Sequence, residues 1–113
     1  MRFKQLFEGD VVVLALSGKF IGGIDHEHFL SEIKALINDG HVDVLVDLSD
    51  VQYVDSTGLG SLVAGLATLR KSGGRMKICG SSERVEDVLI MTRLQLVLEA
   101  HRTREEALAA FGS

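Results

Sequence analysis

The sequence predicts an α/β fold with a mixed, mostly parallel sheet of about four to five strands, which starts with a β-hairpin and is accompanied by about four helices. Two apolar runs at the beginning of the chain are separated by a short turn sequence. After them, short segments rich in Val and Leu alternate with helical patterns. Because strands that alternate with helices form right-handed crossovers in a largely parallel sheet, the expected order is β-β-α-β-α-β-α-β-α.

Length and composition favour one globular domain over residues 1–113. Hydrophobic residues make up 46% and charged residues 25% of the chain, which excludes a disordered polar sequence. The formal net charge of -4, with no run of Lys and Arg, argues against a nucleic-acid partner. The longest apolar run, Val11 to Leu16, is far shorter than the ~20 residues of a membrane span. We therefore expect a cytoplasmic domain without direct membrane insertion.

The first two strands are expected at Phe3 to Glu8 and at Val11 to Ser17. Glu8-Gly9-Asp10 between them has the residues that a tight hairpin turn needs. The next segment, Gly18 to Ile24, contains three glycines and is expected to be a loop, because glycine holds regular structure poorly. The chain is thus predicted to begin with an antiparallel pair of strands.

Asp25 is expected to cap a helix over residues 26 to 38, whose apolar residues recur on one face and which Gly40 ends. Val42 to Leu48 is short and dense in Val and Leu, which is typical of a central strand buried on both faces. A brief turn then leads to a helix over residues 56 to 71.

The last third of the chain contains four further expected elements, a strand at Arg75 to Cys79, a helix capped by Ser81 or Ser82 that runs to about Met91, a short strand at Gln95 to Glu99 and a helix from Arg104 to about Phe111. Thr103 and Glu106 have the spacing of a capping box for the final helix. The acidic pair Glu105-Glu106 is explained by this cap and the helix dipole.

The lone cysteine and the four histidines indicate no metal site or cofactor. Cys79 cannot form an internal disulfide and is expected to be a buried structural thiol. His26 and His28, two residues apart, do not share a helix face, and we expect both to be solvated turn residues. His41 and His101 are expected to be exposed in turns.

The segment from Val44 to Gly60 carries the most information about function. A buried strand leads through a short loop into a helix, which places Ser56 and Thr57 at a helix N-terminus, where unpaired amides and the dipole favour an anion. One interpretation is a phosphorylation site at Ser56, with Thr57 as the second choice. The other is that Asp55, Ser56 and Thr57 are only capping residues.

Two enzyme patterns fail at the same residues. A dinucleotide-binding fingerprint that starts at Gly58 needs glycine at its sixth position, where this chain has Val63. A nucleophile elbow needs glycine two residues before the serine, where this chain has Val54. We expect no enzyme. The rival is a small hydrolase or phosphate-transfer enzyme that uses Asp55 or Ser56, and it would need a base from a distant part of the chain.

The helix after Ser56 has two contrasting sides. The apolar side, expected to pack on the sheet, carries Leu59, Leu62, Val63, Leu66 and Leu69. The opposite side carries the small residues Thr57, Gly60, Ser61, Ala64 and Thr68. Exposed helix faces are normally charged, so we expect another protein to dock closely on the small residues. The alternative is that another part of the same chain covers them.

The hexapeptide Asp55-Ser56-Thr57-Gly58-Leu59-Gly60, preceded by Val46-Asp47-Leu48 and Val51-Gln52-Tyr53-Val54, resembles the signature of the STAS family. The expected order of elements fits that family along essentially the whole chain. The resemblance implies an anti-sigma-factor antagonist, which binds an anti-sigma factor that is also a serine-protein kinase and thereby releases a sigma factor. It also implies that this kinase phosphorylates Ser56, which ends binding, and that a PP2C-type phosphatase restores it.

The partner-binding residues that the resemblance and the helix pattern imply together are Asp55, Ser56, Thr57, Gly58, Gly60, Ser61, Ala64 and Thr68. Many antagonists carry Gly, an acidic residue, Leu and Asp after the second strand, whereas this chain has Gly18-Lys19-Phe20-Ile21, and its nearest carboxylate is Asp25. A second interpretation is a STAS scaffold without a covalent switch, in a stressosome-like or transporter-associated complex. The sequence also leaves open the formation of a homodimer.

Overall fold

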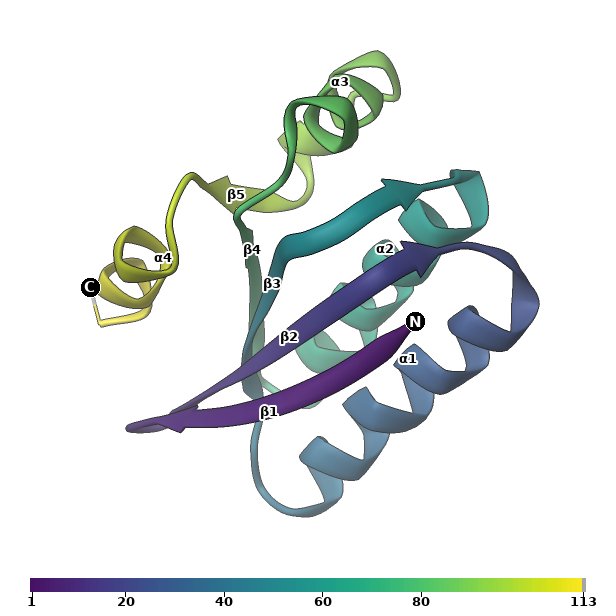
Figure 1. The fold of residues 1–113 in the computed structure, drawn as a ribbon. Coiled ribbons are helices and arrows are strands. Elements are labelled where there is room, and N and C mark those ends of the chain that lie inside the picture. The colour runs from purple at the N-terminus through teal and green to yellow at the C-terminus, as the bar shows by residue number, and fades with distance from the viewer. Residues whose placement is uncertain (113) are drawn as a thin grey trace.

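The computed structural model describes residues 1–112, which form a five-stranded sheet with helices on both faces (Figure 1). The elements in chain order are β1 (Arg2–Glu8), β2 (Val11–Phe20), α1 (Gly22–Asn38), β3 (Asp43–Val54), α2 (Ser56–Lys71), β4 (Arg75–Cys79), α3 (Glu83–Met91), the 3-10 turn η1 (Leu94–Leu96), β5 (Glu99–His101) and α4 (Arg104–Phe111). β1 pairs with β2 antiparallel, and the other neighbours pair parallel in the order β1-β2-β3-β4-β5. The predicted fold class is confirmed.

The sheet separates two apolar cores. On one face α1 and α2 lie side by side (Figure 1), and with α3 they cover the larger core, which includes Phe29 and Leu62. On the other face α4 packs Ala107 and Phe111 against Val13 and its neighbours. β3 contributes buried side chains to both cores, which accounts for its dense run of Val and Leu.

Strands β2 and β3 are longer than the sequence suggests. β2 continues into the expected loop as far as Phe20, and β3 continues past Leu48 to Val54. The two strands stay paired over this extension through two shifts of register, the first of them next to Ser17. The prediction of loops at these positions is wrong, because pairing between distant segments supplies hydrogen bonds that local propensity does not reveal.

Helix α1 also begins earlier than predicted. Its first residue is Gly22 and its N-cap is Ile21, so the predicted cap at Asp25 is wrong. The Asp25 carboxylate instead reaches back one turn and accepts a hydrogen bond from the Ile21 amide at 3.0 Å. One of the backbone groups that a helix start leaves unpaired is thereby satisfied from within the helix.

The prediction of a strand at Gln95 to Glu99 is wrong. Most of that segment lies in the turn η1 and the residues after it, and the strand β5 begins only at Glu99. The helices on either side agree better with their predicted caps. Ser82 and Thr103 each accept a hydrogen bond from the amide three residues further on, which confirms Thr103 and selects Ser82 over Ser81. Among residues 1–112, none of the helices combines the length and hydrophobicity that a bilayer crossing requires.

Candidate functional site

Ser56 lies on the surface as the first residue of α2. β3 ends at Val54, Asp55 is the N-cap, and the side chains of Ser56 and Thr57 are both exposed. The Asp55 amide donates to the carbonyl of Phe20 at 3.3 Å, which holds the end of β3 against the end of β2. The predicted anion position is therefore open to solvent and is held by the two longest strands of the sheet.

Asp55 closes the N-terminus of α2. One oxygen of the Asp55 carboxylate accepts a hydrogen bond from the Gly58 amide at 2.8 Å. The backbone carbonyl of Asp55 accepts a second hydrogen bond from the Leu59 amide at 3.0 Å. The amides of Ser56 and Thr57 come before these two donors in the helix and lie at the positive end of the helix dipole. Asp55 is thus a capping residue, and the environment of the Ser56 hydroxyl still favours a negative charge.

Gly58 is buried where α2 meets the two strands. A Cβ atom at this position would overlap the carbonyl oxygen of Phe20 and lie 2.8 Å from Cγ1 of Val54. Only a residue without a side chain lets α2 start this close to β2 and β3. Gly58 therefore positions the turn that carries Ser56, and its burial removes it from the predicted contact surface.

The predicted small-residue side of α2 is exposed only in part. Thr57 and Gly60 are exposed and Ala64 and Thr68 are half-buried, whereas Ser61 is fully buried, with 0% exposure. The prediction of Ser61 on an outward face is wrong, because α1 lies alongside α2 and covers this position. Of the apolar side, Leu59, Leu62, Leu66 and Leu69 are buried as expected, and Val63 is half-buried.

Ser61 joins α2 to α1. Its hydroxyl donates to the Thr57 carbonyl at 2.9 Å and lies 2.6 Å from Nδ1 of His26. A hydroxyl has one hydrogen, so Nδ1 of His26 is the donor in the second bond. His26 is half-buried, and the prediction of a solvated turn residue is wrong for it. The sequence carries no signal for this bond, since its partners are 35 residues apart.

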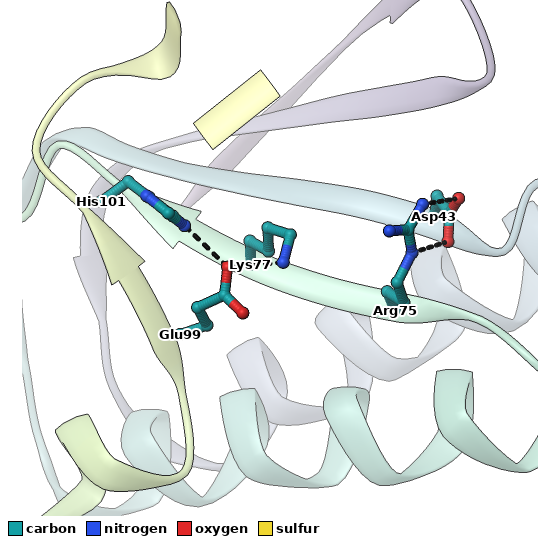
Figure 2. Close-up of polar contacts among 5 residues, drawn as sticks. All are labelled: Asp43, Arg75, Lys77, Glu99 and His101. Carbon is teal, nitrogen blue, oxygen red and sulfur yellow. Dashed lines mark hydrogen bonds and ion pairs between the residues drawn. The ribbon is translucent and has the colours of Figure 1, made fainter. Parts of the chain in front are cut away.

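A second polar cluster lies across β3, β4 and β5 (Figure 2). A carboxylate oxygen of Glu99 is 2.5 Å from the Lys77 ammonium group and 2.7 Å from Nε2 of His101. These two hydrogen bonds lower the pKa of Glu99. Arg75 makes a paired contact with Asp43 across β3 and β4. Because the contacts of Lys77 and Arg75 connect neighbouring strands, we interpret the cluster as structural.

His101 corrects a further expectation. It lies in β5 and is half-buried, so the prediction of an exposed turn residue is wrong. His41 is half-buried as well, with its ring 5.3 Å from that of Phe7. In the structure each ring has a partner. Glu99, two residues away in the same strand, contacts His101, and the ring of Phe7 in β1 lies against His41.

Cys79 is buried at the end of β4, as predicted. Burial and the neighbouring charge of Asp47 raise the pKa of Cys79 to about 12, so the thiol stays protonated near neutral pH and is a poor nucleophile. Burial by itself would raise the pKa of Asp47. Hydrogen bonds from Ser49 and Arg104 outweigh this effect of burial, so the pKa of Asp47 lies below its usual value. The Arg104 contact, at 2.8 Å, ties α4 to β3.

Comparison with known proteins decides the family. The family model of the STAS domain matches residues 5–107. The chain belongs to the STAS domain family. A Thermotoga maritima protein assigned as an anti-sigma factor antagonist is 31% identical over 101 residues, which are 88% of this chain and 88% of that protein. The predicted family resemblance is therefore confirmed.

Solved structures of STAS-type proteins show the same fold. An anti-sigma factor antagonist of Mycobacterium paratuberculosis matches with a TM-score of 0.86 at 23% identity, over 99% of this chain and 94% of that one. The phosphorylated form of the Bacillus cell fate determinant SpoIIAA matches with a TM-score of 0.71 at 20% identity, over 97% and 99% of the two chains. At these identities the likeness establishes the fold.

Proposed function

We propose that this STAS domain is an anti-sigma factor antagonist that docks its partner through the surface around Ser56 and is switched off by phosphorylation of that serine. The observation that carries the proposal is the exposed Ser56 hydroxyl at the N-terminus of α2. The role assigned to the Thermotoga maritima relative supports the antagonist function. SpoIIAA, a protein of the same fold, occurs in unphosphorylated and phosphorylated forms, which supports a covalent switch.

The partner in this proposal is an anti-sigma factor with serine-kinase activity, and a PP2C-type phosphatase reverses the modification. The docking surface consists of Ser56, Thr57 and Gly60, which are exposed, bordered by the half-buried Ala64 and Thr68. These side chains are small and uncharged, so another protein can approach the backbone of α2 closely.

Phosphorylation would act at the interface and leave the fold intact. A phosphate adds a charge of about -1.5 to -2 at the end of α2, where the first amides and the helix dipole can hold it. Docking would then bury a dianion against a surface that fits a neutral hydroxyl, which can cost several kcal/mol. Because every 1.4 kcal/mol is a factor of about ten, affinity would fall by orders of magnitude.

The modification is tested with the purified cognate anti-sigma kinase and ATP, followed by mass spectrometry of peptides. We expect a single phosphate on Ser56, its loss in Ser56→Ala, and its retention in Thr57→Ala, in which the neighbouring exposed hydroxyl is removed. A phosphate that persists in Ser56→Ala would disprove the assignment.

Binding separates the switch from a scaffold role. We expect Ser56→Ala to bind the anti-sigma factor about as well as the wild type and Ser56→Asp to bind at least about tenfold more weakly, measured by calorimetry. Equal binding of Ser56→Asp and wild type would favour a STAS scaffold without a covalent switch.

A further inference from the structure

Two isoleucines are exposed where β2 passes into α1. Ile21, the N-cap of α1, has 41% of its surface exposed, and Ile24, in the first turn of the helix, has 75% exposed. Gly22 and Gly23 between them are also exposed. Isolated exposed apolar side chains are common in folded proteins, but a group of them next to a candidate docking surface indicates a contact with another molecule.

The two isoleucines lie at the start of α1, at the end of the molecule where α2 also starts with Ser56. On one side of them in the chain, the Phe20 carbonyl accepts the Asp55 amide at 3.3 Å. On the other side, His26 Nδ1 contacts the Ser61 hydroxyl at 2.6 Å. The residues that flank Ile21 and Ile24 are thus bonded to the N-cap and to the second turn of α2, so the isoleucines lie at the same end of the molecule as Ser56.

The carboxylates next to this surface are engaged within the domain. Asp25 accepts a hydrogen bond from the Ile21 amide, and its side chain is only 15% exposed. Asp55 accepts a hydrogen bond from the Gly58 amide. The exposed charges closest in the chain to the isoleucines are Lys19 and Glu27, one of each sign. Fully exposed charges next to the isoleucines in the chain are thus few and of both signs, so the surface offers little to a strongly basic partner.

We propose that Ile21 and Ile24 are the apolar anchor of the Ser56 docking surface, and that they fit a partner surface that is itself apolar and uncharged. This inference rests on the proposed function and specifies the chemistry of the anti-sigma factor that this chain recognises. It also gives the switch a physical reason, because a phosphate on Ser56 would stand beside a water-excluding contact, where an unpaired charge is costly.

The test measures the dissociation constant for the cognate anti-sigma factor by calorimetry, with wild type, Ile21→Asp, Ile24→Asp and the control Phe7→Asp. Phe7 is 60% exposed and pairs with Val12 near the start of β2, whereas Ile21 follows the opposite end of that strand. We expect Ile24→Asp and Ile21→Asp each to weaken binding about tenfold or more, as loss of a buried isoleucine contact predicts, and Phe7→Asp to bind like the wild type.

Salt provides an independent readout. Apolar contacts are not screened by ions, whereas exposed charge pairs are, so wild-type affinity should change less than about threefold between about 0.05 and 0.5 M NaCl. Unchanged or tighter binding by the isoleucine variants, or a wild-type affinity that falls about tenfold with salt, would overturn the anchor while leaving the antagonist function standing. No binding by the wild type at any salt concentration would overturn both proposals.

Discussion

At the scale of single residues, Ser61 shows how the surroundings decide the role of a side chain. Its position among small residues of α2 predicts an exposed contact, yet it is buried and receives a hydrogen bond from His26. It also bonds the Thr57 carbonyl, one residue after Ser56. The Ser61 hydroxyl therefore links α1 to the turn of α2 that carries the proposed phosphorylation site.

Replacing Ser61 with alanine should lower the free energy of unfolding by about 1–2 kcal/mol, because the half-buried His26 N–H loses its acceptor. Urea unfolding followed by circular dichroism measures this effect. Thr68→Ala is the matched control, because Thr68 makes the same bond to a carbonyl one turn back, at 2.8 Å. Its removal should cost less than about 0.5 kcal/mol. Equal losses in the two variants would contradict the linking role of Ser61.

At the scale of elements, the start of α2 depends on two glycines with different surroundings. Gly58 is buried against the Phe20 carbonyl and the Val54 side chain. Gly60, half a turn further on, is exposed, and a Cβ atom built there meets nothing within 4 Å. The first glycine sets the approach of the helix to the sheet, and the second leaves the docking surface smooth.

Gly58→Ala should destabilise the domain by about 1–3 kcal/mol, because the added methyl group overlaps backbone that cannot easily move. Gly60→Ala should stabilise it by about 0.5–1 kcal/mol through improved helix propensity. Thermal unfolding of the two variants distinguishes these opposite signs. A stabilising Gly58→Ala would show that α2 can shift away from β2 without penalty.

Element lengths also depend on pairing. The end of β2, with Gly18 and Lys19, has weak strand propensity, and the end of β3 does not stand out from a loop in the sequence. The two segments form strands because they pair with one another, and Phe20 at the end of β2 pairs with Val54 at the end of β3. This pairing carries β3 directly to Asp55, so that the loop expected before α2 shrinks to the N-cap itself.

At the scale of the whole molecule, the ion pair between Asp47 and Arg104 fastens the C-terminal helix to the sheet. Asp47 lies in the central strand with 5% exposure, and Arg104 is the first residue of α4. Two guanidinium nitrogens lie 3.0 and 2.8 Å from the same carboxylate oxygen, and Ser49 bonds the other oxygen. Helix α4 is therefore held on the face of the sheet opposite α1 and α2 by a charged contact as well as by the smaller apolar core.

This pair predicts a dependence of stability on pH. The folded-state pKa of Asp47 is lowered, so its contribution is fully present above the unfolded value of about 3.9 and is lost as pH falls through the folded value. Asp47→Asn should flatten the decline in unfolding free energy between about pH 5 and acid, measured by urea titration at several pH values. Part of the decline in unfolding free energy should remain in this variant, because the pKa of Glu99 is also lowered.

The companion variant Arg104→Leu keeps the carboxylate and its bonds from Ser49. It should lower the free energy of unfolding at neutral pH by about 1–2 kcal/mol, a discounted value because the Arg104 side chain is 39% exposed. An Asp47→Asn protein with the acid dependence of the wild type would show that the pair does not contribute to stability.

The sequence by itself determined the order of strands and helices, the cap at Thr103, a cap at either Ser81 or Ser82, and the serine at the start of α2. These features depend on residues within a few positions of one another, so hydrophobic period and capping chemistry reveal them. The family signature lies in the same stretch and is equally local.

Only the tertiary structure decided the length of β3, the burial of Ser61, and the exposure of Ile21 and Ile24. The decisive contacts join residues that are far apart in the chain, 35 positions for His26 and Ser61 and 57 for Asp47 and Arg104. Local patterns do not record such partners, because a side chain is buried or exposed according to what folding brings against it.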